Sequence, residues 1–415
     1  MKYVIIGAGP AGSVAADTLR AADPGSSVTI IGEENAPPYS RMAIPYYLVG
    51  NIDETGTYLK KQDGYYETNN IELVRSRVTG ISPKEKSVSL ADGSARPYDK
   101  LLIATGARPV KPPIEGLDQP GVHHCWTLED ARNIIDLAQE GSHVVLLGAG
   151  FIGCIILEAL AERGVDLTVV EMGERMVPRM MNETAGGLLQ KWCENKGVKV
   201  FCNTKITQLE PNKDSSDTIQ VDMDNGKSVP AHLVVIAAGV TSNIDFLEGS
   251  GIKTEQGILV DESMQTSLPD IYAAGDVAQG PDFFGGGKAV HAIQPTAADH
   301  GRVAALNMAG QNSVYQGSLI MNVLDTLGLI TASFGQWEGV PGGEQAENLD
   351  ADNYRYINLQ FDKDILVGAI TAGRTDMVGV LRGLIQSKVS LGPWKAALME
   401  DPHRIAEAYV DRKGA

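Results

Sequence analysis

The sequence predicts an α/β protein with two Rossmann-like βαβ units and a C-terminal α+β domain. Two segments carry this prediction, "YVIIGAGPAG" at residues 3–12 and "VVLLGAGFIG" at residues 144–153, because each is an apolar strand that ends in GxGxxG and opens a helix. The third observation is a change of pattern near residue 320, where strand-like and helical stretches replace the βαβ order. With 415 residues, the chain is long enough for two or three domains.

The first unit begins with the β-branched run "KYVII", which stops at the glycines of residues 7–12. Its helix is predicted from "SVAADTLRAAD", where the apolar residues have helical spacing. A second strand, "SSVTII", ends at Gly32 and Glu33. Strand, helix and strand in this order predict a βαβ unit.

The second unit repeats this order in "SHVVLLGAGFIGCIILEALAERGVDLTVVE". Its helix stops at Gly164, and Glu171 lies at the tip of the next strand. Because the architecture is duplicated, we expect each unit to organise its own parallel sheet.

Proline-rich and glycine-containing segments mark the expected domain boundaries. "LLIATGARPVKPPIEGL" ends a strand at Thr105-Gly106 and runs into a proline-rich link near residue 113. "AHLVVIAAGVTSN" closes the second unit with a strand that ends in Gly239, and the chain then returns to the first domain. We therefore expect one domain from residues 1–113 and 250–320, a second from residues 114–249, and a third from residues 321–415.

Composition and charge exclude several classes of partner. The formal net charge of −17 disfavours nucleic acid and anionic lipid, which most of the surface would repel. No uninterrupted apolar run reaches the roughly 18 residues that a membrane span needs. The four cysteines include no CxxC pair, which is typical of a reducing, cytoplasmic setting.

Both glycine motifs predict binding of a dinucleotide. The glycines allow a tight turn and a close approach to a pyrophosphate, and the helix N-terminus then faces the phosphate charge. Glu33 and Glu171 lie about 20 residues further on, as recognition of a ribose hydroxyl requires. Two dinucleotides in one chain indicate that one is held and the other exchanged, with a hydride passing between them. A carboxylate at Glu171 would repel a 2′-phosphate, which favours NADH over NADPH although Arg175 is near.

Five segments together resemble a known family: "VIIGAGPAG", "LLIATGARP", "VVLLGAGFIG", "VVIAAGV" and "IYAAGDVA" follow the order of FAD-dependent pyridine nucleotide-disulfide oxidoreductases. The resemblance covers nearly the whole chain and implies a glutathione-reductase-like architecture with FAD and NADH as cofactors. "YSRMAIPYYL" and "LRGLIQSKVSLGPWKAAL" are most similar to the branch with NADH:rubredoxin reductases and the flavin module of nitrite reductase large subunits.

The resemblance implies a set of FAD contacts in the first domain. The pyrophosphate would lie on the first glycine loop, Glu33 on the ribose, and Arg41 over the flavin nucleotide. The helix start in "QPTAADHG" would face the pyrimidine side of the flavin. The full set is Gly7, Gly9, Pro10, Ala11, Gly12, Glu33, Arg41, Val78, Ala104, Thr105, Gly106, Asp276, Thr296 and Ala297.

The resemblance implies that the NADH contacts lie in the second unit. Neither a metal site nor a catalytic acid or base is expected. The implied residues are Gly148, Gly150, Phe151, Ile152, Gly153, Glu171 and Gly239.

The cysteine positions depart from the disulfide-reducing members of the family. Those relatives keep a cysteine pair just after the first unit, or a lone cysteine in the segment that here reads "PYSRMAIPYYL", whereas this chain has no cysteine before Cys125. A dithiol relay is therefore disfavoured, and the four cysteines are interpreted as small buried hydrophobes. Reduced flavin would then pass electrons to rubredoxin, ferredoxin or another small acceptor.

Ile155 is a second departure, because NAD(P)H-using relatives commonly carry a glutamate there that helps to fix the nicotinamide. Glu158 lies about 4.5 Å further along the helix axis and does not simply replace it. Slow hydride transfer would fit an alternative function: an NADH-binding flavoprotein that acts as a redox sensor or binds partners, resembling apoptosis-inducing factor.

The last fifty residues hold more bases than acids. These bases are either a docking patch for an acidic electron carrier or a solvated helix face. The sequence leaves open whether the protein is a monomer or a homodimer.

Overall fold

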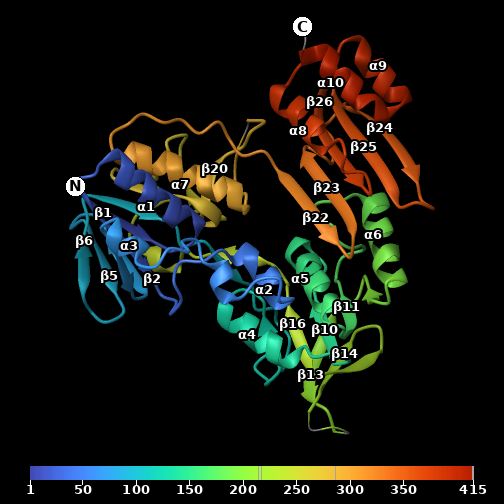
Figure 1. Cartoon of the computed structure of the whole chain (residues 1–415), viewed down its shortest axis with the longest axis horizontal. Helices are drawn as coiled ribbons and strands as arrows, with labels where there is room; N and C mark the ends of the chain where they lie inside the picture. Colours follow the sequence, from blue (N-terminus) through green and yellow to red (C-terminus); the bar gives the residue numbers. More distant parts are fainter. Residues whose placement is uncertain (214, 216, 286, 414–415) are drawn as a thin grey trace. The chain divides into compact units, whose positions relative to one another are not determined.

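The computed structural model describes residues 1–213, 215, 217–285 and 287–413 (Figure 1). The chain divides into two compact units. Unit 1 comprises Met1–Val110 and Val240–Ser318, and unit 2 comprises Lys111–Gly239 and Leu319–Ala415. Each unit contains a parallel sheet with helices, so the predicted α/β class with two Rossmann-like units is confirmed.

The main sheet of unit 1 has five parallel strands in the order β19-β7-β1-β2-β3. Most residues of β1, β2, β7 and β19 are buried, as in a covered parallel sheet, whereas only Ile71 is buried in the edge strand β3. Helices α1 (Pro10–Ala22) and α7 (Gln294–Met308) pack in this unit. The strands are β1 (Lys2–Ile6), β2 (Ser27–Gly32), β3 (Ile71–Arg75), β7 (Lys100–Ile103) and β19 (Ile271–Ala273).

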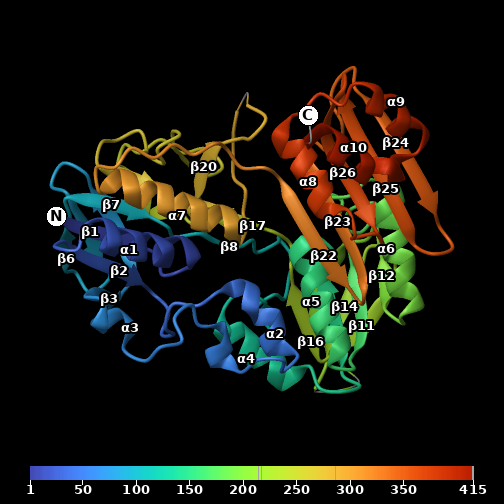
Figure 2. The same cartoon turned by 45° about the horizontal axis from the view of Figure 1, so that its top comes forward.

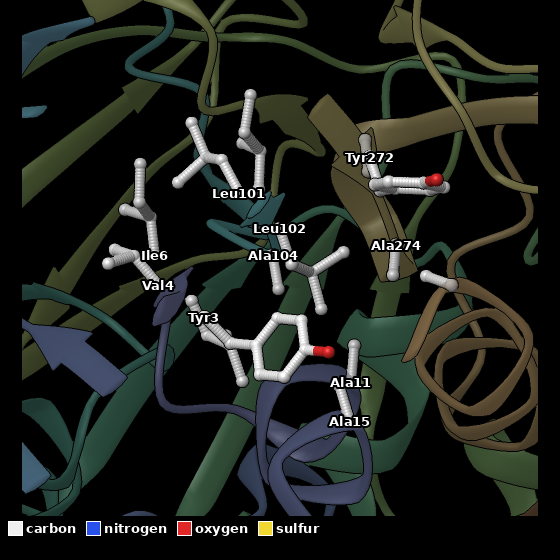
Figure 3. Close-up of a cluster of buried hydrophobic side chains, with 14 of the residues drawn as sticks. Tyr3, Val4, Ile6, Ala11, Ala15, Leu101, Leu102, Ala104, Tyr272 and Ala274 are labelled. Atoms are coloured by element: carbon white, nitrogen blue, oxygen red, sulfur yellow. The ribbon is translucent and has the colours of Figure 1, made fainter. Parts of the chain in front are cut away.

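The core of unit 1 lies where β1 and β7 meet α1. Figure 3 shows Tyr3, Leu102 and Ala104 with Ala11 and Ala15, all of them buried. The alanines are small, so the backbones of strand and helix can approach closely. This packing fixes the start of α1 against the sheet.

Unit 2 has a five-stranded parallel sheet of the same kind, in the order β12-β11-β10-β16-β9. Its helices are α4 (Leu128–Leu137), α5 (Phe151–Glu162) and α6 (Glu183–Asn195). The strands are β9 (Val122–His124), β10 (His143–Leu147), β11 (Asp166–Val170), β12 (Lys199–Phe201) and β16 (Leu233–Ile236).

A three-stranded antiparallel sheet accompanies each parallel sheet, so the duplication extends beyond the glycine loops. In unit 1 it is β4 (Val78–Ser82), β5 (Ser87–Leu90) and β6 (Ala95–Pro97). In unit 2 it is β13 (Ile206–Pro211), β14 (Ile219–Met223) and β15 (Ser228–Ala231).

The C-terminal part of unit 2 is an antiparallel sheet in the order β22-β23-β26-β25-β24, with α8 packed on β23 and β26 (Figure 2). Strand β22 also packs against α5 of the βαβ part. The elements are β22 (Met321–Thr326), β23 (Leu329–Gly335), β24 (Glu344–Asp350), β25 (Arg355–Asp362), β26 (Ile365–Ala372), α8 (Val378–Ser387), α9 (Pro393–Glu400) and α10 (Ile405–Lys413).

Short elements complete unit 1: α2 (Ile44–Leu48), α3 (Tyr65–Thr68), β8 (Ala107–Pro109), β17 (Val240–Ser242), β18 (Ile258–Leu259), β20 (Ala278–Pro281) and β21 (Lys288–Ala289). Over the described residues, no helix is long and apolar enough to cross a membrane.

Candidate functional site

The first glycine loop is anchored between two strands of unit 1. The Gly7 N–H donates to the Ile31 carbonyl of β2 at 2.8 Å, and Gly7 has a φ of +112°. A Cβ at Gly7 would lie 2.0 Å from the Ala104 carbonyl oxygen, and one at Gly12 would lie 2.1 Å from the Gly7 carbonyl oxygen. Glycine at these two positions is therefore required by the packing of strand, loop and helix.

The second loop repeats this geometry in unit 2. The Gly148 N–H donates to the Val170 carbonyl at 2.8 Å, and Gly148 has a φ of +101°. A Cβ at Gly153 would lie 2.1 Å from the Gly148 carbonyl oxygen, and one at Gly148 would lie 2.5 Å from that of Ala237. The two loops are thus built from equivalent contacts.

The middle glycine of each loop is different, because its own fold does not require it. Gly9 and Gly150 have φ values of −77° and −74°, which any residue can adopt. No described atom outside the immediate chain neighbours lies within 4 Å of a Cβ built on either residue. A backbone surface kept open in this way fits the close approach of a pyrophosphate.

The N-terminal ends of α1 and α5, the helices that follow the two loops, can stabilise a negative charge. Gly9 and Gly150 are the N-caps of α1 and α5, and no described side chain caps either helix. In the described first turns of these helices there is also no acidic residue. The N–H groups and the positive end of the helix dipole are therefore available to phosphate, so the residues present fit a dinucleotide.

Three segments that carry predicted FAD contacts converge in unit 1. A Cβ at Gly275 would lie 3.1 Å from the Ala11 Cβ and 3.5 Å from the Ala297 Cβ. The start of α1, the turn before Asp276 and the start of α7 are therefore neighbours. Burial raises the pKa of the Asp276 carboxyl, while the charge of Arg41 acts in the opposite direction.

Arg41 has partners that the sequence did not predict. Its Nη2 lies 2.6 Å from Glu34 Oε1, and its Nη1 donates to Tyr39 Oη at 2.9 Å. Ser40 Oγ donates to Gln294 Oε1 at 2.6 Å, which ties this segment to the start of α7. No periodicity or spacing in the sequence predicts these pairs, and the Ser40–Gln294 pair joins segments 254 residues apart.

The other predicted FAD contacts lie on three further elements. Glu33 is exposed after β2, and its Oε2 is 3.9 Å from Arg77 Nε. Val78 is buried at the start of β4. Thr105 Oγ1 donates to the Asn243 carbonyl at 2.9 Å, and Asn243 Nδ2 donates back to the Thr105 carbonyl at 2.9 Å, which fixes the loop that continues through Gly106.

Glu171 is bonded to the second glycine loop. Its carboxylate accepts from the Ala149 and Gly173 N–H groups, both at 2.6 Å. Arg175 donates instead to the carbonyls of Met181 and Pro178, at 3.0 and 3.4 Å. The acid is therefore held at the loop, while the nearby base is bonded within its own segment.

Val177 is a residue of this region that the sequence analysis missed. It is buried with a φ of +45°, which is rare for a β-branched residue, and its N–H donates to the Ala149 carbonyl at 2.7 Å. The Val177 N–H therefore helps to fix the loop, in addition to the hydrogen bond that Ala149 donates to Glu171.

Phe151, Ile152 and Ile155 are all half-buried on α5. The carboxyl of Glu158 is engaged elsewhere, since it accepts a hydrogen bond from the Leu327 backbone. Burial, then the charges of Asp325 and Glu162, raise the pKa of Glu158 to about 7. Glu158 therefore does not take the place of the missing glutamate. Gly239, the last predicted contact, follows β16 with a φ of +107°.

The four thiols are free, and all have raised pKa values. Burial raises the pKa of Cys125 and Cys193 to about 12 and that of Cys202 to about 11, and it raises that of Cys154 well above the usual value. Cys154 and Cys193 are buried, whereas Cys125 and Cys202 are half-buried. Protonated thiols are poor nucleophiles at neutral pH. In the described part of the chain, no group of His, Cys, Asp or Glu residues is arranged to hold a metal ion.

Comparison with known proteins identifies the family. Residues 1–312 match the family described as pyridine nucleotide-disulphide oxidoreductase. The chain is 31% identical over 414 residues to the NADH-dependent phenylglyoxylate dehydrogenase subunit epsilon of Aromatoleum evansii, a match that covers 99% of this chain and 97% of the relative. It is 28% identical to the NADH-rubredoxin oxidoreductase of Clostridium acetobutylicum, over 90% of this chain and 92% of that one.

A solved structure with a similar fold is the NAD-dependent persulfide reductase from A. fulgidus. It superposes with a TM-score of 0.86 at 29% sequence identity, over 94% of this chain and 78% of that chain. Together, the duplicated glycine loops and these matches show that the chain belongs to the pyridine nucleotide-disulphide oxidoreductase family, as an NAD(P)H oxidoreductase with FAD and NADH as its cofactors.

Proposed function

We propose that this oxidoreductase passes electrons from NADH through FAD to an electron-transfer protein, such as rubredoxin or ferredoxin, without a redox-active disulfide. The observation that carries the proposal is the state of the cysteines. None precedes Cys125 in the sequence, and the four that exist are free thiols with strongly raised pKa values. Electrons therefore have no thiol relay to use and leave from the flavin itself.

Two relatives support a protein acceptor. One, the NADH-rubredoxin oxidoreductase, is named for a small electron carrier. The other, which matches almost the full length of both chains, is named as a subunit of an NADH-dependent dehydrogenase. We infer that the partner of this chain is either a separate carrier or a companion subunit.

The proposed FAD site uses the residues that converge in unit 1. The backbone N–H groups of Gly9 and Ala11, at the start of α1, would bind the pyrophosphate. Pro10 lies between them and has no N–H to donate. Bound FAD accepts a hydride and can release its electrons singly. The start of α7, at Thr296 and Ala297, would direct its positive dipole end at the flavin and stabilise added negative charge.

The proposed NADH site uses the second loop. Gly150 leaves the backbone open to the pyrophosphate, and Glu171, held by two N–H groups, would accept from a ribose hydroxyl and repel a 2′-phosphate. Arg175 is bonded to two carbonyls of its own segment, which supports the preference for NADH.

Three of the C-terminal bases have acidic neighbours. Arg404 pairs with Glu407 at 2.7 Å, Arg412 lies 3.6 Å from Asp411, and Lys395 pairs with Glu344. The charges of these three bases are offset locally, which favours the solvated-face interpretation for them.

The proposal is tested by mixing the FAD-loaded protein with NADH and oxidised rubredoxin without oxygen. We expect fast bleaching of the flavin absorbance, then reduction of the rubredoxin, both unchanged when Cys125 and Cys202, the two half-buried cysteines, are replaced by serine. If either replacement abolished electron transfer but not flavin bleaching, the proposed thiol-free route would be wrong.

Ile155 favours a second candidate function, a slowly reduced NADH-binding flavoprotein that responds to redox state or binds partners. Glu158 does not compensate, because its carboxyl bonds to Leu327. We expect Ile155→Glu to accelerate flavin bleaching by NADH about tenfold or more, since hydride transfer depends steeply on the placement of the nicotinamide. Ile155→Gln separates the effect of charge from that of hydrogen bonding. Fast bleaching in the unaltered chain would exclude this second candidate.

A further inference from the structure

Helix α7 carries a buried histidine to which the proposed electron path gives no role. His300 is 1% exposed, and neither of its ring nitrogens has a hydrogen-bond partner among the described residues. A buried polar group without a partner is costly and calls for an explanation. His300 lies one helical turn after Thr296, on the same side of α7.

The neighbours of His300 form a polar cluster that we call the α7 cluster: His291, Thr296, His300, Tyr315 and Ser318. The His300 ring meets the Tyr315 ring edge-on with centroids 4.6 Å apart. Tyr315 Oη lies 2.7 Å from Ser318 Oγ and also hydrogen-bonds the side chain of Thr296. The hydroxyl groups therefore connect the first turn of α7 to the residues around the buried imidazole.

His291 of the α7 cluster lies near the carboxylate of Asp282, which is more exposed. His291 Nε2 is 3.7 Å from Asp282 Oδ2, and the two side chains are 9% and 24% exposed. His291 Nδ1 is buried and, like the His300 nitrogens, has no partner among the described residues. The charge of His291 acts on His300, and His291 lies near Asp282, so these three titratable groups influence one another electrostatically.

The other groups that face His300 carry little charge. β20 contributes Gly280, whose Cβ position would lie 3.8 Å from His300 Cε1, and the segment after α7 contributes the Tyr315 phenol. On α7 itself, Asp299 is exposed and pairs with Arg302 at 2.8 Å. Burial, and then the charge of His291, lower the pKa of His300 to about 4.

We propose that His300 is a redox-linked proton acceptor of the flavin site, a positioning residue that acts through Thr296 and Tyr315. The inference rests on the proposed placement of the flavin's pyrimidine side at the start of α7. A hydride from NADH brings two electrons and leaves one negative charge on the bound cofactor. His300 then takes one proton from solvent and returns it to solvent when the electrons have left for the acceptor.

The direction of this coupling follows from electrostatics. Burial keeps the imidazole neutral beside an uncharged cofactor, and a negative charge nearby favours the protonated form. The α7 cluster supplies no fixed cation that would neutralise the new charge, because both histidines are neutral while buried. Proton uptake by His300 therefore offsets the charge that reduction adds.

The test is NMR of the ¹⁵N-histidine-labelled, FAD-loaded protein, titrated with acid in the oxidised form and after reduction by dithionite. We expect the proton affinity of His300 to rise about a thousandfold or more on reduction, because uptake of a proton at neutral pH requires such a rise from a pKa of about 4. His300→Gln assigns the signal, and Tyr315→Phe, which keeps the ring but removes the hydroxyl, should diminish the rise. His124→Gln, in unit 2, is the control and should leave the rise intact. Equal titration of His300 in both redox states would overturn the inference.

The experiment separates this inference from the proposed function. Dithionite reduces the flavin whether or not NADH does, so the titration of His300 is read independently of NADH. If NADH failed to reduce the flavin while His300 still changed its proton affinity, the proposed function would be wrong and the inference about His300 would hold. If NADH reduced the flavin but the proton affinity of His300 did not change on reduction, only the inference about His300 would be wrong. The titration itself uses the unaltered chain, and the variants serve only to assign the His300 signal and to test the part played by Tyr315.

Discussion

At the scale of single residues, the two loops contain glycines of two kinds. Gly12 and Gly153 are required by the fold, because a Cβ on either would lie 2.1 Å from a carbonyl oxygen. Gly9 and Gly150 meet no such obstacle among the described atoms. Gly12 and Gly153 are therefore needed for packing. We propose that Gly9 and Gly150 are needed for the approach of the ligand.

This difference predicts the effect of Gly150→Ala. We expect NADH binding to weaken about tenfold or more, because a methyl group would occupy the approach of the pyrophosphate, while stability changes by only about 1 kcal/mol. Isothermal titration with NADH and thermal unfolding measure the two effects. Gly187→Ala, at an open and exposed position on α6, is the control; it should leave NADH affinity unchanged and be neutral or slightly stabilising. Normal NADH affinity in Gly150→Ala would contradict the proposed site.

The raised pKa of Glu158 predicts that the stability of the protein depends on pH. Its pKa is raised from 4.5 to about 7, so the folded chain binds this proton more tightly than the unfolded chain. Stability from this group is therefore present below about pH 4.5 and is lost as the pH rises through about 7.

Glu158→Gln should consequently stabilise the protein at about pH 8 by about 1 kcal/mol, a figure reduced for the partial exposure of the side chain. Near pH 4.5 it should have little effect. Thermal unfolding at the two pH values measures this, with Glu400→Gln on the exposed face of α9 as control. An equal change at both pH values would show that the carboxyl does not titrate as described.

At the scale of elements, the close contact of α1 and α7 positions both helix ends at the proposed FAD site. A Cβ at Gly301 would lie 2.3 Å from the Ala11 carbonyl oxygen. Ala304 and Ala305 are buried on α7 near this contact. Small residues thus allow the two helix backbones to approach.

We expect Gly301→Ala to destabilise the protein by about 1–3 kcal/mol, since either helix must move to admit the methyl group. FAD retention should fall in parallel, because Ala11 lies in the first loop. Thermal unfolding and the flavin content of the purified protein measure these effects. Gly379→Ala on α8, where no described atom lies within 4 Å, should be neutral or slightly stabilising. Unchanged stability in Gly301→Ala would mean that the helices do not touch as described.

At the scale of the whole molecule, net charge governs association with a carrier. The chain has a formal charge of −17, and in the C-terminal segment the bases Lys395, Arg404 and Arg412 are close to acids. An acidic rubredoxin is therefore repelled over most of the surface.

Salt should accordingly accelerate the reduction of an acidic rubredoxin, because it screens the repulsion. We expect the second-order rate constant to rise severalfold between about 0.01 and 0.15 M ionic strength. Stopped-flow reduction of the carrier measures this, and a neutral dye serves as control. A rate that falls with salt would indicate a basic docking surface elsewhere on the molecule.

The sequence determined the fold class and both glycine loops, because strand, GxGxxG and helix are local patterns whose geometry depends on a few adjacent residues. It also determined that no cysteine is available next to the first unit. It did not predict that Arg41 pairs with Glu34, that Ser40 bonds to Gln294, or that the strained Val177 fixes the second loop.

Only the tertiary structure decided what surrounds the individual charged and polar groups. Glu158 bonds to the backbone of Leu327 in the turn between β22 and β23, and His300 is buried beside Tyr315. These contacts depend on how helices pack against strands or segments remote in the chain, and a side chain's pKa depends on that burial. Local patterns therefore predicted where the cofactors bind, whereas packing determined the protonation states of the side chains around those predicted sites.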